Sequence, residues 1–201
     1  MSSKFTLYAL DTETTGLDPV RNEIIEISFL RLADEAQQTW FLKPTNRDSV
    51  EQSALRVNGH KMEDLFHETK FGRETYQEAS KVVAQIENWM MEDMNTPENR
   101  ILVGQNPTFD IAFLQNLWQR CNSAETFPFG HRPFVLDTRQ IALFLDLATG
   151  TESQYYNLGS LVEKYGVKKE RAHQAASDTR MCKNVFMKQV QFVKDLVEKT
   201  K

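Results

Sequence analysis

The alternation of apolar and polar positions along the chain predicts an α/β protein that begins with a strand. Apolar, β-prone runs predict strands at residues 5–10, 24–32, 38–42, 101–103 and 134–136. Residues 23–42 have the pattern of a hairpin with its turn at residues 33–37. The first predicted strand runs directly into Asp11, so a carboxylate follows a buried apolar segment.

Between and after these strands, apolar residues recur at helical spacing. The clearest case is residues 75–94, and a further helix with Thr108 as its N-cap carries apolar residues from Ile111 to Trp118. Further helices are predicted at residues 49–57, 138–147 and 157–165, and from near Ala175 close to the C-terminus. No repeat or linker interrupts this order, so residues 1–201 are predicted to form a single α/β domain.

Composition narrows the class of protein. The chain is 40% hydrophobic and 26% charged, which is typical of globular proteins and excludes a disordered one. Charged residues interrupt every apolar stretch before the ~18 residues that a membrane helix needs, and the N-terminus does not have the pattern of a signal peptide. Cys121 and Cys182 lack the spacing of a disulfide scaffold or a cysteine zinc site, so we predict a cytoplasmic protein.

Charge is unevenly distributed along the chain. The formal net charge is −4, yet residues 164–201 contain ten basic and four acidic side chains. This segment is either a surface that faces a polyanion or a solvated helix face. The negative total argues against non-specific coating of nucleic acid, but not against an enzyme that meets phosphates at one metal-loaded site.

The first candidate for chemistry is D-T-E-T-T-G at residues 11–16. Asp11 and Glu13 are two residues apart on a strand, so they project from the same face about 7 Å apart. Such carboxylates repel unless a cation lies between them, and oxygen ligands suit Mg²⁺ or Mn²⁺. Gly16 is expected to allow a turn with positive φ that brings backbone close to a ligand. The D-x-E pattern is also common in surface turns, so the pair by itself leaves both interpretations open.

Two later segments add candidate groups. Asp110 follows a predicted strand and lies in the first turn of a helix, where the helix dipole also favours an acid of no functional consequence. His173 and Asp178 are five residues apart and would not share a helix face. They can point into one site if His173 lies in a loop and Asp178 in the first turns of the last helix. An accessible histidine can act as a general base near neutral pH.

Taken together, D-T-E-T-T-G, N-P-T-F-D and H-Q-A-A-S-D resemble the three motifs of the DEDDh 3′–5′ exonucleases. This family belongs to the ribonuclease H-like superfamily and includes polymerase proofreading subunits and several ribonucleases. Order and spacing agree across residues 7–183, and residues 23–27 and 135–138 are also similar to the family. The chain has Gln105 where the family often has histidine, which leaves the acid in place and assigns no role to Gln105.

The resemblance implies a central mixed five-stranded sheet flanked by helices and a two-metal-ion mechanism with Mg²⁺ or Mn²⁺. Asp11, Glu13, Asp110 and Asp178 would be the metal ligands, and His173 would take a proton from the attacking water. Glu13 would also meet the terminal 3′-hydroxyl, beside a substrate-binding segment formed by Thr14, Thr15 and Gly16. The substrate would be the 3′ end of single-stranded DNA or RNA, and the products would be nucleoside 5′-monophosphates.

Two alternatives remain open at this point. One is a ribonuclease that trims RNA 3′ ends, since no residue that reads the 2′-hydroxyl can be identified. The other is a nucleic-acid-binding module that acts through a polymerase. Self-association and strand preference are not readable from the chain. Tyr155 and Tyr156 are predicted to lie in a loop, either as ordinary surface residues or as a stacking platform for a base.

Overall fold

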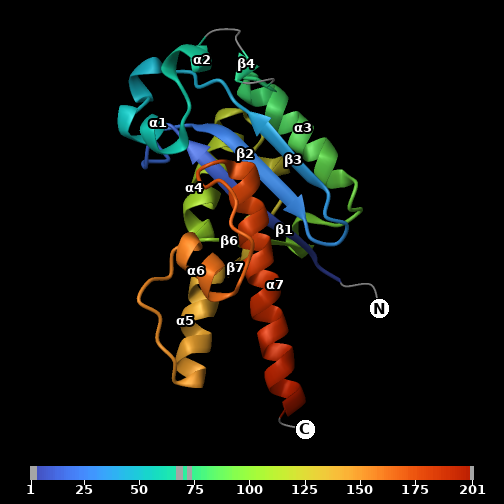
Figure 1. Cartoon of the computed structure of the whole chain (residues 1–201). Helices are drawn as coiled ribbons and strands as arrows, with labels where there is room; N and C mark the ends of the chain where they lie inside the picture. Colours follow the sequence, from blue (N-terminus) through green and yellow to red (C-terminus); the bar gives the residue numbers. More distant parts are fainter. Residues whose placement is uncertain (1–3, 67–69, 72–73, 200–201) are drawn as a thin grey trace.

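The computed structural model describes residues 4–66, 70–71 and 74–199 (Figure 1). Within these residues a five-stranded mixed sheet has the strand order β3-β2-β1-β6-β7. The strands are β1 (Thr6–Thr14), β2 (Ile24–Arg31), β3 (Gln37–Phe41), β6 (Arg100–Gly104) and β7 (Phe134–Asp137). β1, β2 and β3 pair in antiparallel fashion, whereas β6 and β7 run parallel to β1. The predicted five strands and the hairpin are confirmed.

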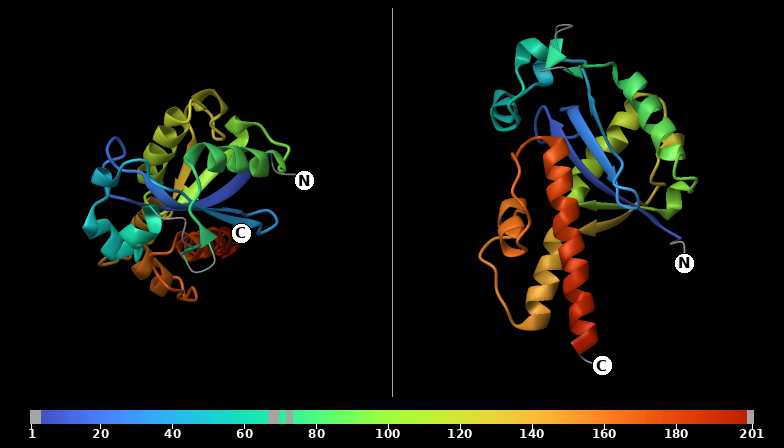
Figure 2. Two further views of the ribbon diagram at one scale, coloured as in Figure 1. Left: turned by 90° about the horizontal axis from the view of Figure 1, so that it is seen from above. Right: turned by 45° about the vertical axis from the view of Figure 1, so that its right-hand side comes forward.

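Helices cover both faces of this sheet, with α3 and α4 on one side and α7 on the other (Figures 1 and 2). The α-helices are α1 (Gln52–Asn58), α2 (Met62–Phe66), α3 (Ala79–Met91), α4 (Pro107–Arg120), α5 (Thr138–Thr149), α6 (Leu158–Lys164) and α7 (Ala175–Lys199). Short elements complete the order: η1 (Arg47–Ser49), β4 (Lys70–Phe71), β5 (Glu74–Thr75), η2 (Pro97–Asn99) and η3 (Ala124–Thr126).

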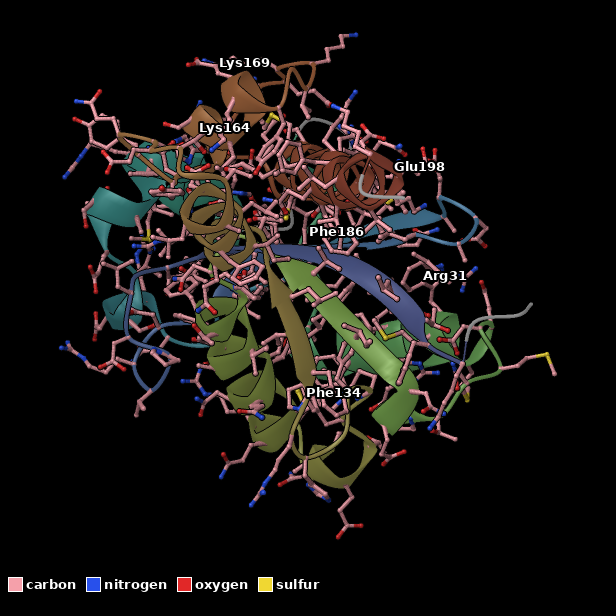
Figure 3. All side chains as sticks on the ribbon, turned by 90° about the horizontal axis from the view of Figure 1, so that it is seen from below. Arg31, Phe134, Lys164, Lys169, Phe186 and Glu198 are labelled. Carbon is pink, nitrogen blue, oxygen red and sulfur yellow. The ribbon has the colours of Figure 1, made fainter. Side chains whose placement is uncertain are left out.

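Alternation along β1 determines which layer each of its side chains meets. Tyr8 and Leu10 belong to the core beneath α3 and α4, where Trp89 and Trp118 are also buried. Leu7 packs on the opposite face, against Phe186 of α7. Figure 3 shows Phe186 between α7 and the sheet. Since side chains alternate with period two, odd-numbered positions of β1 face α7, and Asp11 and Glu13 are among them.

Two local predictions are wrong, for identifiable reasons. β1 does not end at residue 10 but continues to Thr14, because its pairing with β2 continues through the acidic motif. Asn106, and not Thr108, occupies the N-cap position of α4, and its side chain forms no capping hydrogen bond. Pro107 occupies the first helical position, where its missing N–H and fixed φ are tolerated, and Asn106 adopts the left-handed conformation at φ 59°.

The basic C-terminal segment forms ion pairs with acids of the same chain. Lys164 pairs with Asp146, and Lys183 of α7 pairs with Glu35 at 2.5 Å. Lys169 lies on the outer surface beside α6 (Figure 3) and is 68% exposed. Part of this charge is therefore neutralised locally. In the part of the chain that is described, no helix combines the length and apolar character needed to cross a membrane.

Candidate active site

The site begins where β1 continues beyond the end of its parallel neighbour. The last residue pair between β1 and β6 joins Ala9 to Val103, and β6 ends at Gly104. Asp11 and Glu13 therefore have β2 on one side and no β6 residue opposite them on the other. This register allows groups from the helices on both faces to approach the same stretch of β1.

Asp110 approaches from the α4 side. It lies in the first turn of α4 and is buried, and its Oδ1 accepts a hydrogen bond of 2.7 Å from the Thr12 hydroxyl. Burial raises the pKa of Asp110 to about 7, although the Thr12 hydrogen bond acts in the opposite direction. Thr12 is an even-numbered residue of β1 and so faces α4, which explains how it reaches this carboxylate.

Three side chains meet at this edge of the sheet: Glu13 from β1, His173 from the loop before α7, and Asp178 from α7 itself. One ligand atom from each of these side chains lies within 4.8 Å of the others. His173 is exposed in the loop before α7, with φ 62°, and its backbone N–H donates to Asp178 Oδ2 at 3.0 Å. Asp178 is in the first turn of α7. The sequence required a loop position for His173 and a helical one for Asp178, and the structure provides both.

The acids at this edge disfavour one another's ionisation. Burial, and then the charges of Asp110 and Glu13, raise the pKa of Asp11 well above its ordinary value. Burial, followed by the carboxylates of Glu26 and Asp178, raises the pKa of Glu13 to about 8. Burial also raises the pKa of Asp178. Each shift means that deprotonation is unfavourable without a compensating positive charge.

The site has the character of a divalent-cation site. Asp178 Oδ1 is buried and accepts no hydrogen bond from any residue that the structure describes. A buried carboxylate oxygen without a donor is costly, and a hard cation with oxygen ligands would satisfy it. The mutual repulsion of the neighbouring carboxylates would be relieved by the same ion. The residues present therefore fit a divalent metal.

The segment after Glu13 is a tightly bonded turn. The Thr14 hydroxyl donates to the Gly16 carbonyl at 2.6 Å, and the Thr15 hydroxyl accepts the Glu23 N–H at 2.9 Å. Gly16 does not have positive φ, so that expectation is wrong. Glycine is needed for space instead, since a Cβ here would lie 2.4 Å from the Asn22 amide. Asn22 is buried and held by two hydrogen bonds to backbone atoms, so it cannot move away.

A cavity of about 300 Å³ lies next to Glu13, between this turn and α1. Its wall includes Leu17 and Val57, which are 79% and 58% exposed, and Phe109 at the start of α4. A cavity with a mostly apolar lining and one carboxylate is typical of a ligand-binding site.

The sequence did not identify a buried polar network behind Glu13. Glu26 of β2 is the register partner of Glu13. His60 Nε2 lies 3.1 Å from Glu26 Oε2, and His60 Nδ1 lies 2.5 Å from the Tyr76 hydroxyl. The available signal was the single acid within the apolar run of β2. His60 follows Gly59, which ends α1, and its contact with Glu26 connects α1, a wall of the cavity, to β2 beneath the acids.

The sequence of this chain is similar to those of known exonucleases and DNA polymerases. A family model described as exonuclease, of the RNase T type, matches residues 8–186. The chain is 30% identical over 194 residues to the PolC-type DNA polymerase III of Thermotoga petrophila, and 25% identical over 193 residues to that of Staphylococcus haemolyticus. These alignments cover 95% of the chain but only 12% of the length of either relative.

Solved structures share the fold at lower identity. The zinc ion bound form of an Escherichia coli exonuclease I complex with single-stranded DNA has a TM-score of 0.74 and 17% identity, covering 96% of this chain and 42% of that one. Cell-death related nuclease 4 has a TM-score of 0.74 and 16% identity, covering 94% of this chain and 65% of that one. The predicted ribonuclease H-like architecture is confirmed.

Proposed function

The chain belongs to the exonuclease family whose model spans residues 8–186, and from this we propose that it is a metal-dependent 3′–5′ exonuclease. It would hydrolyse the terminal phosphodiester bond of a nucleic acid strand and release nucleoside 5′-monophosphates. The observation that carries the proposal is the convergence of Glu13, His173 and Asp178 beside the carboxylates of Asp11 and Asp110. This arrangement combines a metal-binding set with a base at one edge of a sheet.

The proposed cofactor is a pair of divalent ions, either Mg²⁺ or Mn²⁺. These ions would neutralise the charge of the phosphate, lower the pKa of the attacking water and stabilise the leaving oxygen. Asp11, Glu13 and Asp178 are assigned to one ion, with Asp11 shared by the second. Asp110 would act on that second ion directly or through water. Asp178 Oδ1 has no hydrogen-bond partner among the described residues, and the pKa values of Asp11 and Glu13 are raised; both observations support this assignment.

His173 is assigned as the general base that accepts a proton from the attacking water. Its side chain is exposed, so it can meet solvent, and its ring lies within 4.8 Å of ligand atoms of Glu13 and Asp178. The hydrogen bond from its backbone N–H to Asp178 fixes the base relative to a ligand. The proton would then pass from the exposed imidazole to bulk water.

Recognition of a strand end is assigned to the cavity beside Glu13. Glu13 would accept a hydrogen bond from the terminal 3′-hydroxyl, and Leu17 and Phe109 would contact the terminal base. The backbone of Thr14, Thr15 and Gly16 forms the adjoining wall. A cavity that ends at a carboxylate accommodates a free hydroxyl more readily than a continuing phosphodiester, because a phosphate would repel Glu13.

Single-stranded DNA is the substrate that we place first. The Escherichia coli exonuclease I structures that share the fold hold single-stranded DNA, and the chain is similar to part of DNA polymerases. On the same grounds a polymerase is the partner that we propose. RNA of equal sequence is the comparison substrate, since the 2′-hydroxyl is the difference that an end cavity would meet.

Oligonucleotides labelled at either end, incubated with Mg²⁺, Mn²⁺ or EDTA, test the proposal. We expect 5′-monophosphates to be released from the 3′ end only when metal is present. Degradation that persists in EDTA, or that begins at the 5′ end, would contradict it. Tight binding of the strand with no cleavage under any metal would instead support a binding module.

A further inference from the structure

A second cavity lies along the same sheet edge as the acids, on the side away from α1. β1, β6 and β7 are parallel, so their C-terminal ends lie at one edge, where ligands of open α/β sheets bind. β6 ends just before Gln105, and β7 ends two residues before Arg139. Adjacent strands are about 4.8 Å apart, so β7 lies about 10 Å from β1. Gln105 and Arg139 both line this cavity, whose volume is about 440 Å³.

The floor of this cavity is held by hydrogen bonds. Gln105 Nε2 donates to the Tyr156 carbonyl at 2.6 Å, and Gln105 Oε1 accepts from the Thr138 hydroxyl at 2.8 Å. The Tyr156 hydroxyl donates to Asp146 Oδ2 at 2.9 Å. Both side chains therefore have structural partners. The Tyr156 ring also packs against the buried cluster formed by α5, α6 and α7, which leaves Tyr155 as the more exposed ring at this cavity. The hydrogen bonds also give Gln105 a role that the sequence did not assign.

Two side chains at the rim of this cavity, Arg139 and Tyr155, are not held by hydrogen bonds in this way. The guanidinium of Arg139 is exposed and forms no hydrogen bond or ion pair with any described residue, although its backbone N–H donates to Asp137 at 2.9 Å. Tyr155 is 60% exposed as a residue, and its hydroxyl accepts a weak hydrogen bond of 3.3 Å from Gln154. An exposed aromatic ring beside an unpaired cation matches the two components of single-strand recognition: base stacking and phosphate binding.

We propose that Arg139 and Tyr155 bind the part of the single strand that lies 5′ to the cleaved bond. Tyr155 would stack on a base, and Arg139 would bind a backbone phosphate. This inference rests on the proposed function and gives the strand a direction. Its 3′ end enters the cavity beside Glu13, and the rest of the strand crosses the acids and the N-terminus of α4 towards β7.

Two substrates of different length test this assignment. One is an oligothymidylate of about 20 nucleotides, long enough to reach a stacking platform, and the other is the p-nitrophenyl ester of thymidine 5′-monophosphate, which has no upstream strand. For Tyr155→Ala we expect the ratio of kcat/KM on the oligonucleotide to kcat/KM on the ester to fall by about 5- to 150-fold, the value of one base–aromatic stack. Tyr155→Phe keeps the ring and should restore the ratio.

Salt dependence separates the role of Arg139 from that of Tyr155. Arg139→Gln should make the slope of log affinity against log salt shallower by about 0.7, the value of one phosphate contact on a single strand. Arg132→Gln is the matched control, because Arg132 is also exposed but precedes β7, at the opposite edge of the sheet. It should leave the slope as in the wild type.

An unchanged substrate ratio in Tyr155→Ala, or an equal change of slope in Arg132→Gln and Arg139→Gln, would overturn the inference. Failure of the proposed function is recognised separately, as absence of hydrolysis of both substrates by the wild type. In that case fluorescence anisotropy of the labelled oligonucleotide still decides the inference. The affinity of Tyr155→Ala would then be lower than that of the wild type if the platform exists, and equal if it does not.

Discussion

The backbone N–H of His173 donates a hydrogen bond of 3.0 Å to Asp178 Oδ2. The proposed base and a proposed metal ligand are therefore fixed relative to each other, although one lies in a loop and the other in α7. His173 has φ 62°, a conformation that few residues other than glycine adopt without compensation. The hydrogen bond to Asp178 supplies part of that compensation, so the loop and the helix act as one unit.

For His173→Ala we expect kcat to fall about 10²- to 10⁴-fold, the usual contribution of a general base. The backbone bond to Asp178 survives this substitution, so Mn²⁺ affinity should stay near the wild-type value. Single-turnover kinetics together with a Mn²⁺ titration measure both quantities. His131→Ala is the control, because His131 is exposed in the loop before β7. Wild-type turnover in His173→Ala would remove His173 from the mechanism.

Asp178→Asn should abolish metal-dependent hydrolysis and yet stabilise the metal-free protein. The substitution replaces a carboxyl group whose ionisation is disfavoured by burial with a neutral amide. The amide keeps an oxygen that can accept the hydrogen bond from the His173 N–H. A gain of about 1 kcal/mol would raise Tm by about 2–4 °C for a chain of this size. Thermal unfolding in EDTA measures this. Asp195→Asn, at an exposed position of the same helix, should change Tm little. A lower Tm for Asp178→Asn would indicate a structural role.

The stability of the metal-free protein should fall as pH rises. Glu13 and Asp110 have pKa values raised to about 8 and about 7, above their values of roughly 4 in an unfolded chain. Between about pH 4 and pH 8 the folded state therefore binds more protons than the unfolded state, and the free energy of unfolding decreases across this window.

Mg²⁺ should counteract this loss, and its stabilising effect should grow with pH because it binds the deprotonated carboxylates. Thermal unfolding across the window, with EDTA and with Mg²⁺, measures both trends. Glu13→Gln should flatten the EDTA curve. Stability in EDTA that rises steadily towards pH 8 would contradict the electrostatics of the site.

Gly16→Ala should destabilise the protein by about 1–3 kcal/mol, the usual cost of overpacking. The added Cβ would meet the buried Asn22 amide at 2.4 Å, and the turn beside Glu13 would have to shift. KM should rise with it, because this turn forms a wall of the proposed end cavity. Gly159→Ala in α6 is the control, since its Cβ would meet Asn157 no closer than 3.4 Å. Urea unfolding that places both variants at wild-type stability would refute the steric argument.

Some features of the site were predictable because they depend on neighbours along the chain. The period of two on a strand placed Asp11 and Glu13 on one face, and the first-turn positions of Asp110 and Asp178 followed from the start of the helical pattern. The N-cap of α4 was missed, because Pro107 and the left-handed Asn106 determine it more strongly than the hydroxyl of Thr108. The sequence indicated that a glycine is needed at position 16 because of a positive φ. The structure shows that it is needed because the Asn22 amide leaves no space for a Cβ.

By itself the sequence determined the order of strands and helices, the acids on β1 and the family that the motifs resemble, since each depends on local periodicity or on residues close together in the chain. Only the tertiary structure decided that β1 continues beyond β6 and so opens Asp11 to α4 and α7 at once. It also decided that Glu26 faces Glu13, that Asn22 fills the space beside Gly16, and that Tyr155 is exposed while Tyr156 is bonded. These relationships join residues far apart in the chain, and strand register and packing between layers determine them, so no local pattern in the sequence encodes them.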